Sequence, residues 1–224
     1  RKLREDDQGP KYLNTPETPV YHKSRVLYGL DLAKRDISRN RQVVIVEGYT
    51  DVMACHLAGI TTAIATCGTA FGSDHITVVR RVLGDTDDPS QGSRGEVIFT
   101  FDPDEAGQKA ASRAFAEESR FAAQTFVAVP PEGLDPCDVR IQRGDQALRE
   151  VINSRSPMYE FMIKQVMNSC DLNTVEGRSN ALRMATPIVA KIRDRVIRDG
   201  YSRELAGWLG MNPDDVAREI RQAP

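Results

Sequence analysis

The chain has 224 residues, with 30 Lys and Arg side chains against 32 Asp and Glu side chains, so its formal net charge is −2. This length suits one large domain or two small ones, and the 40% of apolar residues is usual for a soluble globular protein. No run approaches the roughly 18 apolar residues of a membrane helix, and no signal-like segment opens the chain. Because the chain begins at Arg1 in a polar stretch, we expect it to be part of a longer protein.

The charge is unevenly distributed along the chain. Residues 1–41 carry 10 basic and 6 acidic side chains (net +4), residues 42–140 carry 7 and 15 (net −8), and residues 141–224 carry 13 and 11 (net +2). Blocks of one sign repel themselves unless cations or a partner compensate them. The acidic middle therefore indicates either a site that gathers cations or carboxylates scattered over a solvated surface, and the near-zero total does not exclude a nucleic-acid partner.

The cysteines and histidines form no metal-binding motif. They are widely spaced, without a C-x-x-C pair: Cys55, Cys67, Cys137, Cys170, His22, His56 and His75. A structural zinc site is therefore not expected, and isolated thiols fit a reducing cytosol better than a disulfide framework.

Strands alternate with helices between residues 42 and 140. Short apolar runs rich in β-branched residues predict buried strands over 42–47, 61–66, 95–102 and 124–129. Helices are expected between them, with Thr50 and Ser73 as N-caps and Gly84 as a stop, and a flexible loop is expected over 85–95. This alternation predicts an α/β fold with a parallel sheet and right-handed crossovers.

Helical periodicity dominates after Asp145, where no β run is found. Asn212-Pro213-Asp214 predicts the start of a last short helix, because proline is favoured in the first helical turn. We therefore expect three parts: an N-terminal part with a basic linker over 1–41, an α/β domain over 42–140 and a helical subdomain over 141–224.

Acidic residues follow two of the predicted strands. Glu47 ends the first strand with Asp51 one helical turn beyond it, and Asp102 ends the third strand with Asp104 following in D-P-D. Functional residues of open parallel sheets gather at the carboxyl ends of the strands. If these two strands are neighbours, the carboxylates form one acidic pocket that suits Mg²⁺ or Mn²⁺. Taken singly, each residue is equally explained as a surface strand end or a helix cap.

These motifs resemble a known family. VEGYTDV and FDPDEAG resemble the Toprim fold, an acidic metal-binding module of bacterial primases, topoisomerases and some nucleases. PKYLNTPETPVYHKSRVLYGL before them, CGTAFGSDHI between them and RELAGWLG near the end resemble DnaG-type bacterial primases, so that the resemblance spans nearly the whole chain. It implies a Toprim-like parallel sheet flanked by helices and followed by an all-helical subdomain of an RNA polymerase domain.

The resemblance also implies roles for individual residues. Catalysis is assigned to Glu47, Asp102 and Asp104, and metal binding to Glu47, Asp51, Asp102, Asp104, Asp135 and Asp138. Nucleotide or template binding is assigned to Lys11, Asn14, His22 and Lys23. The third acidic motif departs from the family's usual D-P-D, because it reads Asp135-Pro136-Cys137 with Asp138 next. Either Asp138 reaches the site by a local backbone shift, or that ligand is missing.

The activity implied is DNA-directed RNA primer synthesis in replication, by Mg²⁺- or Mn²⁺-dependent nucleotidyl transfer from ribonucleoside triphosphates on a single-stranded DNA template. The implied setting is the bacterial cytoplasm at replication forks. Contacts with the replicative helicase and single-strand-binding protein are expected through parts of the protein outside this chain, and no membrane partner is implied. The alternatives are a Toprim topoisomerase or nuclease, or a non-catalytic module that binds nucleic acid or protein. A topoisomerase needs a tyrosine nucleophile, and none of the tyrosines stands in a suggestive motif.

Overall fold

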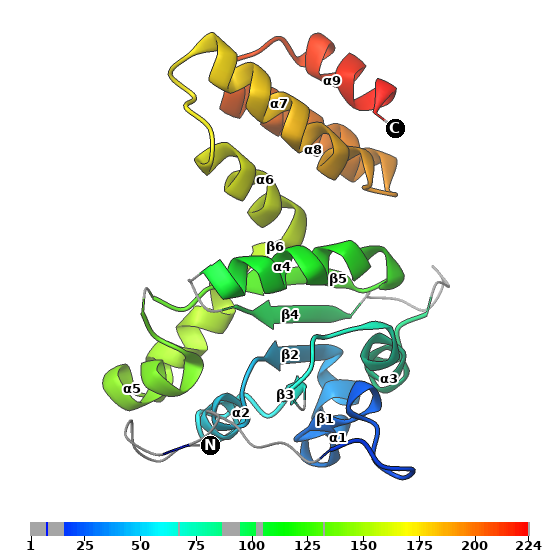
Figure 1. The fold of residues 1–224 in the computed structure, drawn as a ribbon, viewed down its shortest axis with the longest axis vertical. Helices are drawn as coiled ribbons and strands as arrows, with labels where there is room; N and C mark the ends of the chain where they lie inside the picture. Colours follow the sequence, from blue (N-terminus) through cyan, green and yellow to red (C-terminus); the bar gives the residue numbers. More distant parts are fainter. Residues whose placement is uncertain are drawn as a thin grey trace. The chain divides into compact units, whose positions relative to one another are not determined.

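A computed structural model of the chain describes residue 8 and residues 16–66, 68–86, 95–101, 105–131 and 133–223. The chain divides into two compact units, Arg1–Arg155 and Ser156–Pro224. The first unit is an α/β structure built on a sheet (Figure 1). The second is helical, apart from the two-residue strand β6 (Ser156–Pro157) at its start.

The sheet of the first unit confirms the predicted α/β fold. Its strand order is β1-β3-β2-β4-β5, and the neighbouring strands from β3 to β5 run parallel. The strands are β1 (Leu27–Tyr28), β2 (Gln42–Val46), β3 (Ala63–Thr66), β4 (Glu96–Thr100) and β5 (Gln124–Ala128). The short β1, which pairs antiparallel with β3, was not predicted, because two residues carry no periodicity.

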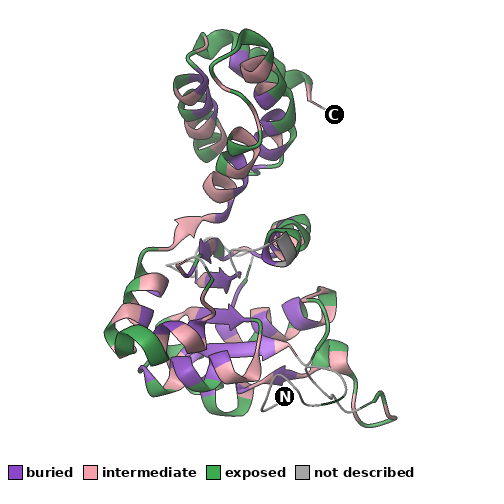
Figure 2. Cartoon of the chain, turned by 60° about the vertical axis from the view of Figure 1, so that its left-hand side comes forward, coloured by how far each residue is buried: buried purple, intermediate pink, exposed green. Residues whose placement is uncertain are grey.

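Helices cover both faces of this sheet. They are the 3₁₀ turn η1 (Lys23–Arg25), α1 (Leu30–Asn40), α2 (Tyr49–Leu57), α3 (Ser73–Leu83), α4 (Glu105–Glu117), the 3₁₀ turn η3 (Glu118–Arg120) and α5 (Pro136–Asn153). Helix α1 packs on α3, and α2 packs on α5. Val44, Val46 and Ile98 join the core beneath α2 and α5. Val43 and Phe99, at alternate positions, point to the opposite face and are also buried. Figure 2 shows most of the sheet in purple, the colour of buried residues. Burial on both faces explains the continuous apolar runs in the sequence.

Two helix starts differ from prediction. Gly48 rather than Thr50 is the N-cap of α2, and Gly72 rather than Ser73 is the N-cap of α3. In each case the side chain three residues later accepts a hydrogen bond from the glycine N–H: Asp51 Oδ2 at 2.9 Å and His75 Nδ1 at 3.3 Å. A reciprocal partner within the helix thus supports an N-cap that has no side chain of its own.

The second unit consists of α6 (Met158–Asn168), α7 (Val175–Ala190), α8 (Arg195–Leu209) and α9 (Pro213–Gln222). Helix α9 begins as predicted, with Pro213 in its first turn and Asn212 as its N-cap. Trp208 is half-buried, and the Lys164 ammonium lies 5.8 Å from its ring centroid. The expected boundary at 140/141 falls within α5.

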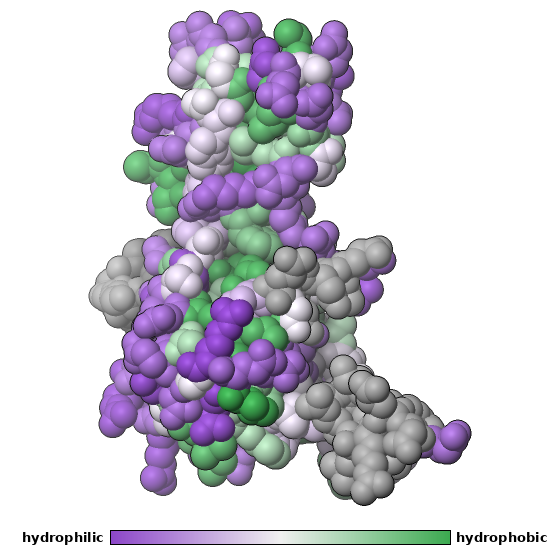
Figure 3. All heavy atoms as spheres, turned by 90° about the vertical axis from the view of Figure 1, so that its left-hand side faces the viewer, coloured by the Kyte–Doolittle hydropathy of each residue, from purple (hydrophilic) through white to green (hydrophobic). Residues whose placement is uncertain are grey.

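The surface is mixed in character. In the space-filling view, apolar atoms lie among hydrophilic side chains (Figure 3). Exposed apolar side chains occur on several elements, such as Leu57 on α2 and Ile141 on α5. No helix among the described residues is both long enough and apolar enough to cross a membrane.

Candidate active site at the carboxyl ends of the strands

The strands that carry the two acidic motifs are neighbours in the sheet. Strands β2 and β4 are parallel, and Ile45 is aligned with Phe99. Two residues further along, Glu47 is therefore level with Phe101, the residue before Asp102. The Glu47 side chain is exposed at this edge. Asp102 and Asp104 lie outside the described residues, so their convergence with Glu47 stays a prediction, but the strand adjacency on which it depends is confirmed.

A cavity of about 360 Å³ opens beside Glu47. Phe71, from the loop after β3, forms one wall, with its ring 5.4 Å from that of Phe99. Arg113, on the exposed side of α4, also lines the cavity. The cavity therefore combines a carboxylate, a guanidinium and an aromatic ring, which suits a ligand that bears both phosphate and an apolar face.

Asp51 is buried, with 4% of its surface exposed, and both of its carboxylate oxygens accept backbone hydrogen bonds. Oδ2 accepts from Gly48 N–H at 2.9 Å, and Oδ1 accepts from Cys137 N–H at 3.3 Å. The second bond joins the first acidic motif to the Asp135-Pro136-Cys137 segment, which follows β5 on the far side of β4. Asp51 thus holds together two segments at the same edge of the sheet, whether or not it also binds a metal.

Asp135 is the N-cap of α5, and its Oδ1 accepts a hydrogen bond from Asp138 N–H at 2.7 Å. Pro136 occupies the first turn, and Asp138 is half-buried. Asp135 therefore already has a structural role at the start of the helix. Within the described parts of the chain, no three His, Cys, Asp or Glu side chains come together as a metal site. Asp102 and Asp104 lie outside those parts.

Cys55 lies on α2 one turn after Asp51 and is fully buried. Burial, together with the smaller effects of the nearby Asp51 carboxylate and of Cys137, raises the pKa of this thiol to about 12. Cys55 is therefore a neutral thiol at physiological pH and packs as a small apolar residue. It joins the core cluster against which Cys137 packs.

The candidate nucleotide- and template-binding residues before the sheet are only partly described. Lys11 and Asn14 lie outside the described residues. His22 Nδ1 lies 3.4 Å from Glu17 Oε2, so this exposed histidine has an acidic partner. Lys23 donates its backbone N–H to Glu17 at 2.9 Å, but no acidic side chain of the described residues forms an ion pair with its ammonium.

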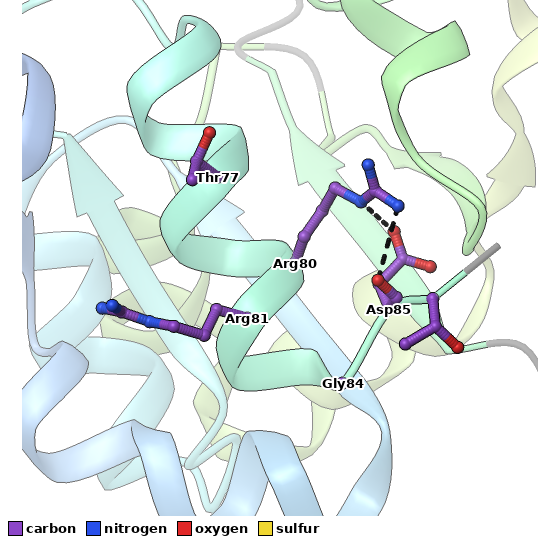
Figure 4. A pocket seen from close by; sticks show the side chains of 6 residues that line it. Thr77, Arg80, Arg81, Gly84 and Asp85 are labelled. Carbon is purple, nitrogen blue, oxygen red and sulfur yellow. Dashed lines mark hydrogen bonds and ion pairs between the residues drawn. The ribbon is translucent and has the colours of Figure 1, made fainter.

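A second cavity, of about 280 Å³, lies at the end of α3 (Figure 4). Arg80 Nε lies 3.1 Å from Asp85 Oδ2, and the same oxygen accepts a hydrogen bond from Ala122 N–H at 3.0 Å. Because one Asp85 oxygen contacts both Arg80 and Ala122 N–H, Asp85 fastens the end of α3 to the segment before β5. Buried Asp85 also offsets the charge of Arg80. Their contact is a structural ion pair rather than a candidate phosphate site.

Sequence reasoning missed the cavity residues Arg113 and Phe71. Arg113 is an ordinary surface cation in the helical pattern of α4, and only the fold brings it to the same cavity as Glu47. Phe71 stands in the CGTAFGSDHI segment, which resembles the primase family as a whole segment and gives no role to a single residue. An aromatic residue in a glycine-rich loop after a strand was the available signal.

Family models match three parts of the chain. Residues 1–34 match the N-terminal domain of the DNA primase catalytic core, and residues 41–129 match the Toprim domain. Residues 159–214 match the DnaB-helicase binding domain of primase. We expected helicase contacts outside this chain, whereas the helicase-binding model matches residues within it.

Two relatives illustrate the sequence similarity. The DNA primase of Streptomyces coelicolor is 55% identical over 223 residues, which are 99% of this chain and 34% of the relative. That of Mycobacterium tuberculosis H37Rv is 52% identical over 221 residues, which are 98% of this chain and 34% of the relative. The chain thus spans about a third of the length of the curated relatives it matches.

Solved structures match the fold. The RNA polymerase domain of Mycobacterium tuberculosis primase DnaG, in complex with double-stranded DNA, matches with a TM-score of 0.80 and 52% identity over 95% of this chain and 65% of that one. A DnaG primase catalytic domain bound to single-stranded DNA matches with a TM-score of 0.75 and 31% identity, over 94% of this chain and 64% of that one. The chain therefore belongs to the DnaG-type bacterial DNA primases and corresponds to the Toprim-containing part of their RNA polymerase domain.

Proposed function

We propose that this chain is the part of a primase that joins ribonucleotides into an RNA primer on a single-stranded DNA template. The reaction is nucleotidyl transfer from ribonucleoside triphosphates, with release of pyrophosphate. The observation that carries the proposal is the adjacency of β2 and β4, which puts Glu47 beside a cavity and next to the strand that precedes Asp102 and Asp104. The activity is a proposal for the full-length protein, because this chain spans about a third of the curated relatives it matches, and the proposed setting is the bacterial cytoplasm.

The chemistry of the available side chains fits a hard divalent cation. Glu47 offers exposed carboxylate oxygens at the cavity, and the fully buried Cys55 thiol is neutral. Mg²⁺ or Mn²⁺ would be held by Glu47, Asp102 and Asp104, with Asp51, Asp135 and Asp138 as further candidates. When bound, the cation would neutralise phosphate charge. Asp51 and Asp135 already accept backbone hydrogen bonds, so we assign them first to holding the surrounding segments.

The cationic side chains near the strand ends are assigned to phosphate binding. Arg113 in the cavity offers a planar guanidinium that binds phosphate oxygens in pairs, while Lys23 offers a compact charge. We assign Lys23, with Lys11, Asn14 and His22, to nucleotide and template phosphates. Contacts of this kind hold single-stranded DNA by charge rather than by sequence.

The helical unit is the proposed site of helicase contact within this chain. Support comes from the family model of the DnaB-helicase binding domain, which matches residues 159–214. Single-strand-binding protein is assigned to other parts of the longer protein.

Glu47→Gln in the full-length protein tests the proposed activity. The substitution keeps the shape of the side chain and removes its charge, so we expect primer synthesis to fall by roughly 100-fold or more. Primer yield is measured with ribonucleoside triphosphates and a single-stranded template, and circular dichroism checks the fold.

The matched control is Glu176→Gln, the same change at an exposed position in the first turn of α7. We expect this variant to make primers at the wild-type rate. Near-normal primer yield from Glu47→Gln would overturn the assignment and favour a binding module.

A further inference from the structure

The turn η1, which carries Lys23, is fastened to the first turn of α3 by two side chains. His75 Nε2 lies 2.9 Å from the Lys23 carbonyl oxygen. Asp74 Oδ2 accepts a hydrogen bond from Ser24 Oγ at 2.9 Å and lies 3.6 Å from Arg25 Nε. These contacts join segments about fifty residues apart in the sequence and hold η1 from both ends.

The hydrogen bonds of His75 indicate its tautomer. Gly72 N–H can only donate, so His75 Nδ1 at 3.3 Å must accept and carries no proton. The proton of the neutral ring is therefore on Nε2, which donates it to the Lys23 carbonyl. The residue is 1% exposed, and its ring stacks on Phe71 with 5.6 Å between centroids and 20° between planes.

His75 thus connects two parts of the candidate active site. On one side it holds the backbone of Lys23, whose ammonium forms no ion pair with the described residues. On the other side it supports Phe71, which lines the cavity that Glu47 and Arg113 share. A lysine on a turn that is fastened at both ends loses less conformational entropy when it binds phosphate than a lysine on a loosely held segment.

We propose that His75 is a positioning residue for substrate phosphate: it fixes the Lys23 turn against the Phe71 loop, so that the Lys23 ammonium is held ready for a phosphate of the nucleotide or of the template. This inference rests on the proposed function, because Lys23 is assigned to phosphate only there. It adds a role for a buried side chain that touches neither the cavity nor the substrate.

The test measures binding to the full-length protein rather than catalysis. Two probes separate the sources of phosphate: ATP with Mg²⁺ for the nucleotide, and a single-stranded DNA oligonucleotide for the template. His75→Leu removes both hydrogen bonds, and we expect it to raise the Kd of at least one probe by roughly 10-fold. His75→Gln keeps an amide donor that reaches the Lys23 carbonyl, and we expect it to restore affinity to within roughly 3-fold of wild type.

A double-mutant cycle separates positioning from general damage to the fold. If His75 acts through Lys23, His75→Leu changes the Kd little once Lys23→Ala is present, because the two effects are not additive. If His75→Leu raises the Kd by the same factor with and without Lys23, the inference is wrong. It is also wrong if the folded His75→Leu variant binds both probes as tightly as wild type.

Asp74→Ala covers the case in which His75→Leu does not fold. Asp74 is half-exposed and fastens the other end of the same turn, so we expect a rise of roughly 3-fold in the same Kd. An unchanged Kd would then overturn the inference. Failure of the wild-type protein to make primers would instead overturn the proposed function, and the binding comparison would still decide the role of His75.

Discussion

Asp51 shows how one residue supports both the fold and the candidate site. The E-G-x-x-D motif indicates a metal ligand, and the structure adds that this carboxylate accepts the N–H groups of Gly48 and Cys137. The first bond caps the start of α2, and the second holds the first turn of α5 against α2. Both oxygens of this buried carboxylate thus have hydrogen-bond partners within the protein. Its part in the fold can therefore be tested apart from its predicted metal binding.

We expect Asp51→Ala to lower the free energy of unfolding by about 2 kcal/mol, because two backbone N–H groups lose their acceptor in a largely buried place. Thermal unfolding followed by circular dichroism measures the change. Glu47→Gln is the comparison, and it should unfold at the wild-type temperature because this side chain is exposed. Equal stability of Asp51→Ala and wild type would contradict the structural role.

At the scale of elements, the strands were predictable and their attachments were not. Each parallel strand is a short apolar run, so residues 42–47 and 124–129 predicted β2 and β5 closely. The caps were wrong at Thr50 and Ser73, because the supporting groups belong to residues three positions later. Contacts such as Cys137 N–H to Asp51 join residues 86 apart, and no local pattern in the sequence encodes them.

The start of helix α7 offers a test of close packing in the second unit. A Cβ atom on Gly177 would clash with the backbone oxygen of Asp171, so any side chain there forces the turn before the helix to move. We expect Gly177→Ala to destabilise the protein by about 2 kcal/mol. Urea unfolding followed by the fluorescence of Trp208, the single tryptophan of the chain, measures this directly.

Gly200→Ala is the matched control within α8, where an added Cβ meets no atom within 4 Å. Alanine favours the helix over glycine, so this variant should be more stable than wild type by about 0.5–1 kcal/mol. The two substitutions are chemically identical and should shift the urea midpoint in opposite directions. A shift in the same direction for both would show that the close approach at Gly177 is not decisive.

At the scale of the whole molecule, the acidic excess and the basic excess lie in different parts of the chain. Residues 42–140, with a net charge of −8, include the parallel strands β2 to β5 and the acidic residues that follow β2, β4 and β5. The basic excess lies in the flanks. Lys23 belongs to the first flank, and its carbonyl oxygen contacts His75 of α3. The near-neutral total therefore hides a separation between an acidic middle region and basic flanking segments.

This separation predicts that the chain binds nucleoside triphosphate only with a divalent cation. A triphosphate is itself strongly negative, and the acidic region repels it until about two divalent ions offset roughly four of the excess charges. Calorimetric titration with ATP should show binding in Mg²⁺ or Mn²⁺ and none in EDTA.

The control is NaCl at the same ionic strength as the Mg²⁺ buffer, because NaCl screens charges without supplying a divalent cation. Equal binding in EDTA would contradict a metal-dependent site, and binding restored by NaCl alone would reduce the effect to screening. Glu47→Gln should weaken the Mg²⁺-dependent binding, which would connect the charge of the region to this one strand end.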